Sequence, residues 1–335
     1  MVWRARFCRL ALALGLAGMG AGASADDGVE AREPLQLASR APAAVSVAAA
    51  AHVAVIYPKL DEPFGTVFRQ IVSGIESVVE HPVVSIALGG SDAVDTVEAT
   101  LREQGTRVVI ALGRHGLEVA TSLADRLPVV GGAVLASPVD ASGADAVVSL
   151  TPDPDLLFRR LAVLSPHTRR VFVVHSRPQS DWLITLARRS ADGLGIELVA
   201  APADDRRAAL LAFQEIMREA RPMDAIWLPQ DALVVDRDVI LPYVLQQAWD
   251  RSLVLFSSTL GHVQRGALFA LYPDNRRMGE RLASSALSLT ERRGGVARVE
   301  PLRELLAAVN VRTAGHLGLA LDDRLGDYAL TFPVR

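Results

Sequence analysis

The sequence predicts an α/β protein with two doubly wound parallel-sheet lobes, and three observations lead to this fold class. Short apolar runs of strand length alternate with amphipathic segments of helix length along the chain, a rhythm typical of parallel strands joined by helices. The rhythm breaks at residues 131–145, which are rich in Gly, Ser, Pro and Asp, and then restarts. With 335 residues, half of them hydrophobic, the chain is long enough for two such blocks with separate cores.

The first block opens with a strand, a loop and a helix. Residues 53–56 form a short, continuous apolar run, which indicates a strand that is buried on both faces. A turn-rich loop follows at residues 57–65, and Val67, Ile71 and Ile75 then recur at the spacing of an amphipathic helix. Because ligands of open α/β sheets bind beyond the carboxyl ends of the strands, this loop is a candidate ligand loop.

The later elements repeat this unit. In the first block we expect strands at 82–88, 107–112 and from 129, and helices at 92–104 and 117–124. In the second block we expect helices at 155–164, 182–191, 210–220 and 239–249, and strands at 170–174, 196–200, 225–228 and 253–256. A strand at 266–271, a helix at 278–289, a strand at 305–311 and a tail with a short helix complete the chain. We interpret residues 131–145 as a hinge because their composition is typical of loops.

The N-terminal residues predict an exported protein. Residues 1–25 have a basic start, an apolar middle and the small-residue site Ala23-Ser24-Ala25, which indicates a signal peptide cleaved near Ala25. The apolar stretch is too short to span a bilayer. Residues 26–50 are rich in Ala, Pro and Ser and predict a flexible leader. We therefore expect a periplasmic protein whose mature form has no cysteine, because Cys8 is the only one.

The charge balance excludes some partners. The chain has 35 basic and 38 acidic residues, and loss of the three signal arginines leaves a net charge of about minus six. This balance favours neither nucleic acid nor an anionic membrane surface, so we expect no nucleic-acid partner. Lys59 is the only lysine in the chain. A coding bias towards arginine accounts for that composition, while the place of Lys59 in the opening loop also allows a functional role.

Motifs of catalysis are missing from the sequence. It contains no G-x-S-x-G elbow, no H-E-x-x-H zinc helix, no P-loop and no Rossmann glycine motif. The seven histidines are scattered without the spacing of metal ligands. We therefore expect no enzymatic activity, no metal and no cofactor. The glycine turns at 89–91 and 113–116 suit either an anion at a helix N-terminus or an ordinary connection.

The loops at the strand ends carry side chains that suit a small-molecule ligand. Hydroxyl and N–H groups can hold a carboxylate, an Asp can hold an ammonium group, and an aromatic ring can hold an apolar body. The candidate ligand-binding residues are Tyr57, Lys59, Phe64, Gly113, Arg114, Ser137, Ser176, Gln230, Asp231, Ser257, Ser258, Tyr272 and Asp274.

Several stretches, in order and spacing, resemble a known family. They are VAVIYPKLDEPFGTVFRQIVSGIE from residue 53, VFVVHSRPQSDWLITLARRSADGLGIELV from 171, MDAIWLPQDALV from 223, LVLFSSTLGHVQRGALFALYPDNRRMGERLASSAL from 253 and AAVNVRTAGHLGLAL from 307. These stretches resemble the exported substrate-binding proteins of ABC importers, in the branch with tryptophan- and tyrosine-binding members.

The resemblance implies the type I periplasmic-binding-protein fold, in which a three-segment hinge joins two lobes that close over a ligand. It places lobe 1 at 51–148 and 262–293 and lobe 2 at 149–261 and 294–335, with crossings near Ser149, His262 and Gly294.

The same resemblance implies a periplasmic solute-binding protein of an ABC importer. Its ligand would be an amino acid or related carboxylate, and its partner an ABC permease, through which alone it would meet the membrane. The chain departs from the family pattern at 229–233 and 136–140. These departures keep an alternative open, a non-transport envelope sensor or protein-interaction module with an altered pocket.

Overall fold

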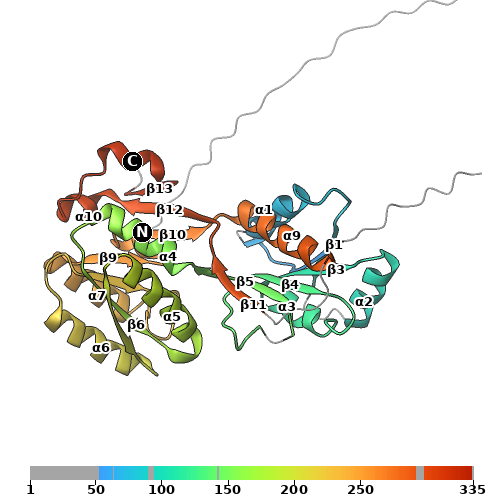
Figure 1. Cartoon of the computed structure of the whole chain (residues 1–335), viewed down its shortest axis with the longest axis horizontal. Coiled ribbons are helices and arrows are strands. Elements are labelled where there is room, and N and C mark those ends of the chain that lie inside the picture. Colours follow the sequence, from blue (N-terminus) through green and yellow to red (C-terminus); the bar gives the residue numbers. More distant parts are fainter. Residues whose placement is uncertain (1–52, 63, 90–93, 142, 292–297, 334–335) are drawn as a thin grey trace, which may run out of the picture. The chain divides into compact units, whose positions relative to one another are not determined.

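The computed structural model describes residues 53–62, 64–89, 94–141, 143–291 and 298–333. The predicted signal peptide and the predicted leader lie outside the described residues. The described chain forms two sheets of six and seven strands, each flanked by helices (Figure 1). The predicted α/β class with two doubly wound, mainly parallel sheets is confirmed.

The first sheet is wholly parallel and has the order β11-β5-β4-β3-β1-β2. Its strands are β1 (Val53–Pro58), β2 (Val84–Leu88), β3 (Val108–Leu112), β4 (Val129–Val134), β5 (Ala146–Pro152) and β11 (Arg298–Leu302). The helices α1 (Phe64–Glu76) and α9 (Asn275–Glu291) pack on one face, and α2 (Val94–Glu103) and α3 (Gly113–Thr121) pack on the other. Burial on both faces explains why the strands of this sheet are continuous apolar runs.

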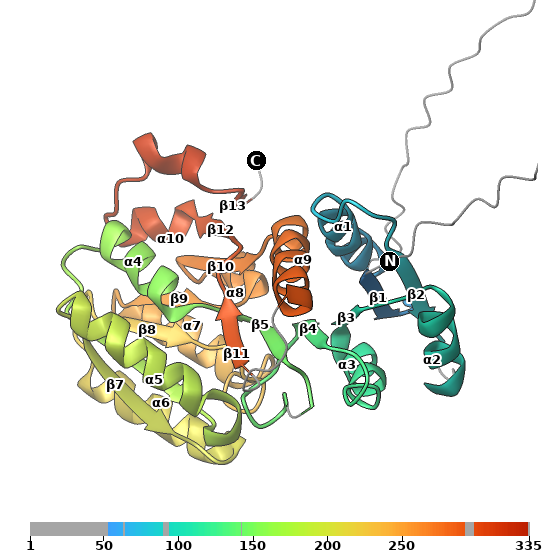
Figure 2. The ribbon, with the colours of Figure 1, turned by 45° about the vertical axis from the view of Figure 1, so that its right-hand side comes forward.

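Two glycines let α1 and α9 approach each other closely (Figure 2). A Cβ atom added at Gly74 would lie 2.0 Å from the carbonyl oxygen of Arg276, and one added at Gly279 would lie 2.0 Å from that of Ile71. No heavy atoms approach so closely, so each position requires glycine. Segments some 200 residues apart in the sequence are thereby packed into one lobe.

The second sheet has the order β13-β12-β10-β9-β8-β6-β7 and is parallel except where β12 runs against β10. Its strands are β6 (Arg170–His175), β7 (Glu197–Pro202), β8 (Ala225–Leu228), β9 (Val254–Ser257), β10 (Phe269–Pro273), β12 (Leu305–Asn310) and β13 (Leu330–Phe332). Its helices are α4 (Pro154–Leu164), α5 (Arg177–Gly193), α6 (Arg206–Glu219), α7 (Ile240–Asp250), α8 (Leu260–Arg265) and α10 (Val311–His316), with a 3₁₀ helix, η1 (Asp322–Asp327), before β13. One core lies beneath α4 and α5, and a second lies beneath α6 and α7.

The predicted hinge at residues 131–145 is wrong, because this segment lies within the first lobe. It holds the end of β4 and the connection to β5, a strand that the composition did not predict. A Cβ atom at Gly132 would lie 2.5 Å from Leu282 Cδ1, and one at Gly131 would lie 2.9 Å from Leu117 Cδ1. These glycines therefore serve close packing of helices on a strand, and they do not mark a flexible boundary.

The chain passes between the two sheets three times, at places that differ from the predicted ones. The crossings follow β5 at Pro152–Asp153, β10 at Pro273–Asp274, and β11 at Arg303–Glu304. The crossing predicted near Ser149 lies a few residues later, because β5 continues to Pro152. The crossing predicted near His262 lies about a dozen residues later, because β10 continues to Pro273. Gly294 lies outside the described residues, but β11, which follows it, still belongs to the first sheet.

The three crossings are hydrogen-bonded to one another. The N–H of Asp153 donates to the Leu302 carbonyl and the N–H of Asp274 donates to the Glu304 carbonyl, both at 2.9 Å. Each aspartate also accepts an N–H from the first turn of the helix that follows it, α4 or α9. The third crossing is thus held between the other two.

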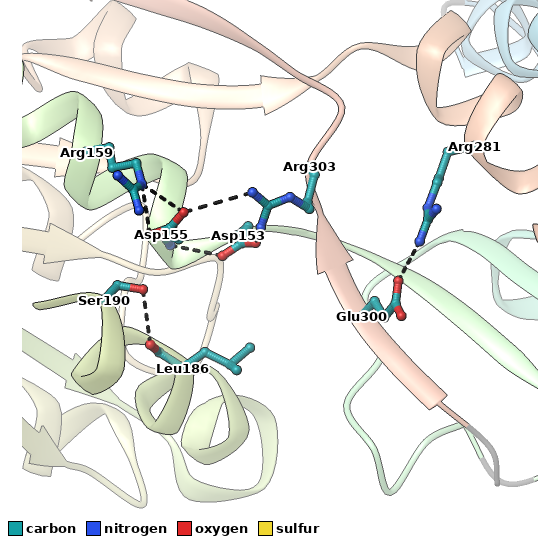
Figure 3. A network of polar contacts seen from close by, with 8 residues as sticks. All are labelled: Asp153, Asp155, Arg159, Leu186, Ser190, Arg281, Glu300 and Arg303. Carbon is teal, nitrogen blue, oxygen red and sulfur yellow. Dashed lines mark hydrogen bonds and ion pairs between the residues drawn. The ribbon is translucent and has the colours of Figure 1, made fainter. Parts of the chain in front are cut away.

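An ion-pair network reinforces the first and third crossings (Figure 3). Arg303 pairs with the nearly buried carboxylate of Asp153 and lies 3.9 Å from that of Asp155. Asp155 in turn accepts two hydrogen bonds from Arg159 at 3.0 Å. A more exposed pair, Arg281 and Glu300 at 2.8 Å, joins α9 to β11 within the first lobe.

Candidate functional site

The carboxyl ends of β4, β3 and β1 lie side by side in the first sheet. They bring six predicted residues to one edge, the lobe 1 edge: Tyr57, Lys59, Phe64, Gly113, Arg114 and Ser137. Tyr57 is the next-to-last residue of β1, and its ring stacks on Phe68 at 6.2 Å between centroids. Gly113 begins α3 with φ of +73°, and a Cβ atom there would lie 3.5 Å from the Pro58 ring. The left-handed backbone favours glycine at this turn. The turns that follow β1 and β3 are therefore neighbours.

Each of these two neighbouring turns carries a cationic side chain. Lys59 follows Pro58 and Arg114 follows Gly113, and both side chains are exposed. Neither side chain has a hydrogen bond or an ion pair with another described residue. The lobe 1 edge therefore offers two positive charges that the described part of the chain leaves uncompensated.

The acidic side chains of the lobe 1 edge differ in whether they have hydrogen-bond partners. Glu62 accepts hydrogen bonds from Thr66 and Arg69, which lower its pKa. Asp140 accepts the N–H of Ser137 at 3.0 Å and its hydroxyl at 2.8 Å, so the predicted ligand residue Ser137 is held by its own loop. Among the described acids of these loops, only Asp61 lacks a side-chain partner within the described residues.

Large apolar side chains are exposed beside these charges. Leu60 and Phe64 in the β1–α1 connection are 47% and 63% exposed, and Val139 after β4 is 81% exposed. Of these, the sequence analysis named only Phe64. An aliphatic residue in a loop carries no pattern that distinguishes an exposed side chain from a buried one, so Leu60 and Val139 could not be selected beforehand.

The carboxyl ends of β6, β8, β9 and β10 are neighbours in the second sheet and form the lobe 2 edge. Here the predicted residues bond to each other. Asp231 is 5% exposed and accepts the N–H of Ser176 at 2.9 Å and its hydroxyl at 2.6 Å. It also accepts the Ser180 hydroxyl at 3.1 Å and the N–H of Leu233 at 3.2 Å. Its carboxylate therefore joins the start of α5 to the loop after β8.

Ser257 and Ser258 at the end of β9 are similarly engaged. Ser257 Oγ lies 2.8 Å from Nδ1 of His262 and accepts the N–H of Thr259 at 3.0 Å. Ser258 Oγ accepts the indole N–H of Trp227 at 3.1 Å. Ser257 is fully buried. The serine–histidine contact therefore lies in the interior of the second lobe.

Two histidines of lobe 2 have shifted acid–base behaviour. Burial, together with the nearby Arg265 and Arg237, lowers the pKa of His262 to about 4. Burial also lowers the pKa of His175, although the carboxylate of Asp181, 3.4 Å from its Nδ1, opposes that shift. Both imidazoles are therefore neutral at neutral pH, and neither adds a positive charge to the lobe 2 edge.

The remaining predicted residues belong to the lobe 2 edge and the second crossing. Gln230 is half-buried in the loop after β8. Tyr272 is half-buried near the end of β10, where burial and then Asp274 raise its pKa. Asp274 caps α9 through the N–H of Arg277 at 3.1 Å. Asp274 thus has a structural role at the crossing.

A separate groove of about 610 Å³ lies on the second lobe between α7, α8 and α10. Trp249 lines it, with His316 stacked on the indole at 3.8 Å and Arg312 at 5.5 Å from the ring centroid. Within the lobe's own structure the indole is thus already flanked by two side chains.

Within the described residues, no three His, Cys, Asp or Glu side chains gather in a way that could hold a metal ion. None of the described helices has the length and apolar character needed to cross a bilayer.

Comparison with known proteins supports the fold. No protein-family model matches the chain, and no curated protein sequence matches it. Among the solved structures that share the fold are the following three. One is a ligand-free, open substrate-binding protein with adhesive properties from Clostridium difficile, with a TM-score of 0.60 and 14% identity over 83% of this chain and 98% of that one. Another is the ABC domain in complex with L-Trp from Streptococcus pneumonia, with a TM-score of 0.50 and 15% identity over 84% and 100%. The third is a conserved domain protein from Vibrio cholerae, with a TM-score of 0.50 and 18% identity over 84% and 99%.

These matches extend over almost the whole length of each solved chain and include substrate-binding proteins. The chain has the type I periplasmic-binding-protein fold, and the resemblance predicted from the sequence is confirmed at the level of the fold. At identities below 20% the likeness carries no information about the ligand.

Proposed function

We propose that the protein is an exported solute-binding protein that holds a small molecule between the lobe 1 edge and the lobe 2 edge. One observation carries the proposal: within the described residues, two mainly parallel sheets are joined by three crossings, of which the third is hydrogen-bonded to the other two. Ligands of open α/β sheets bind beyond the carboxyl ends of the strands. A shared hinge lets two such edges close over a ligand.

The proposal includes the compartment and the partner. The basic and apolar character of residues 1–25 favours export to the periplasm, with cleavage near Ala25. An ABC permease is the partner that fits a solute-binding protein of this fold. We propose binding rather than catalysis, because the Ser257–His262 contact lies in the interior of the second lobe.

A thermal-shift screen tests the proposal directly. A ligand that binds only the folded state stabilises it by mass action, by about 2.7 kcal/mol when its concentration is 100 times Kd. For a chain of this size that corresponds to a rise of several degrees in Tm. The panel should hold amino acids, sugars and small carboxylates. Folded protein whose Tm is unchanged by every compound would contradict the proposal.

A second candidate is a non-transport module of the same fold that binds another envelope protein. It is favoured by the internal pairing of Ser176 with Asp231 and of Ser258 with Trp227, which leaves few free polar groups on the lobe 2 edge. Co-purification of a stoichiometric envelope protein, with no response to small molecules, would favour this candidate.

A further inference from the structure

The lobe 2 edge has little capacity left for a charged group of a ligand. Asp231 is the buried acid that could hold an ammonium group there, yet four donors of its own lobe already bond to its two oxygens. The exposed Asp181 lies 3.4 Å from Nδ1 of His175. An ammonium group at Asp231 would have to displace its four donors and leave them unsatisfied in a buried place. Each such loss costs about 1–3 kcal/mol.

The lobe 1 edge has the opposite property. Lys59 and Arg114 follow the neighbouring strands β1 and β3, are exposed, and bond to no other described side chain. A guanidinium and an ammonium group together suit a carboxylate, which can accept hydrogen bonds from both. Leu60 and Phe64, both exposed, lie one residue from Lys59 and at the start of α1.

From these features we infer that the ligand is an apolar organic anion without an ammonium group, such as an aryl- or alkyl-carboxylate, and that Lys59 and Arg114 bind its carboxylate. Phe64 and Leu60 cover its apolar body, and Leu233 of the lobe 2 edge, 43% exposed, supplies the facing apolar surface. The inference rests on the proposed function and narrows its ligand.

At the lobe 1 edge, Asp61 is the side chain that could bind the ammonium group of an amino acid. It is exposed and unpaired within the described residues, and it lies two positions from Lys59. As a single exposed carboxylate it offers an ammonium group one weak ion pair, whereas Lys59 and Arg114 together offer a carboxylate two charged donor groups. We therefore assign Asp61 no part in binding, and the experiment includes it.

Four compounds with the same phenyl group separate these cases by isothermal titration calorimetry on the purified protein. They are 3-phenylpropionate, an anion; L-phenylalanine, a zwitterion; 3-phenylpropionamide, neutral; and 2-phenylethylamine, a cation. We expect 3-phenylpropionate to bind at least tenfold more tightly than the other three. Lys59→Ala and Arg114→Ala should each weaken its binding about tenfold and leave the amide unaffected. Arg107→Ala, which removes an exposed arginine at the opposite end of β3, is the matched control and should change nothing.

The possible results separate the inference from the proposed function. Tighter binding of L-phenylalanine, lost in Asp61→Asn, would overturn the inference and leave a solute-binding protein. Binding of a sugar or another neutral solute from the thermal-shift panel, with no binding of the carboxylate, would also overturn the inference and leave a solute-binding protein. Folded protein that binds none of these compounds would overturn both.

Discussion

The lobe 1 edge and the lobe 2 edge have the same position in their sheets, but they differ in whether their polar side chains are already hydrogen-bonded. Both lie at the carboxyl ends of parallel strands, yet the lobe 2 edge bonds its polar side chains to each other, as with Asp231 and Ser176. The lobe 1 edge leaves Lys59 and Arg114 without side-chain partners among the described residues and exposes Phe64. The polar side chains of the lobe 2 edge thus serve stability, whereas the two cations of the lobe 1 edge are available for binding. The comparison predicts that substitutions in lobe 2 change stability and substitutions in lobe 1 change affinity.

The largest effect should come from Asp231→Ala. The substitution leaves the Ser176 N–H, the Ser176 hydroxyl and the Ser180 hydroxyl without their acceptor in a buried place. We expect the free energy of unfolding, measured by urea titration, to fall by about 3 kcal/mol.

Asp238→Ala is the control for this experiment, since Asp238 is exposed in the same loop. It should change the free energy of unfolding by less than about 0.5 kcal/mol. Equal, small effects for the two variants would remove the distinction between the edges.

The second effect concerns pH. The fold favours neutral His262, whose pKa falls to about 4, whereas a histidine in the unfolded chain has a pKa of about 6.5. The unfolded chain therefore binds more protons between these two values, so stability is retained above pH about 6.5 and is lost as the pH falls towards 4. The loss attributable to this group approaches about 3 kcal/mol.

Urea titrations of the parent and of His262→Gln across pH 4 to 7 test this loss. The variant should have a smaller slope of stability against pH over that window. Identical slopes for the parent and the variant would mean that protonation of His262, which contacts Ser257 in the interior, does not cause the loss of stability.

The smallest effect on the free energy of unfolding should come from the ion pairs in and beside the crossings that join the two lobes. Arg303→Ala removes the cation beside Asp153, whose side chain is 10% exposed, and should lower the free energy of unfolding by about 1 kcal/mol. Arg281→Ala breaks a pair whose two side chains are 44% and 37% exposed, so its effect should be within about 0.5 kcal/mol. Thermal unfolding of both variants compares them. A larger loss for Arg281→Ala would contradict the assigned importance of the crossing (Figure 3).

Strands and helices of the fold could be predicted because apolar periodicity is a local signal. The strands β1, β3 and β6 and the helices α4 and α9 are found near their expected places. The strands β5 and β11 were not predicted, and residues 131–145 were taken for a hinge, because glycine composition does not distinguish a flexible segment from one that packs against Leu282. The true crossings lie at Pro152–Asp153 and Pro273–Asp274, where a proline ends a strand and an aspartate caps the next helix.

The grouping of the strand-end residues was predictable from the sequence, whereas their hydrogen bonding was not, and their binding of a ligand stays a prediction. The strand ends identified from the sequence do lie together in two edges, since the order of parallel strands determines which loops are neighbours. The sequence could not show that Ser176 bonds to Asp231, 55 residues away, or that Ser258 bonds to Trp227. Such pairing depends on tertiary contacts that leave no local pattern.

The most direct test of the account uses the fact that Lys59 is the only lysine. An amine-reactive reagent modifies exposed Lys59 and the N-terminal amine, which site mapping by mass spectrometry separates. The account predicts that saturating 3-phenylpropionate slows modification of Lys59 at least fivefold and leaves the N-terminal amine unchanged. An unchanged rate at Lys59, with the ligand shown to be bound by calorimetry, would contradict the claim that the lobe 1 edge receives the ligand.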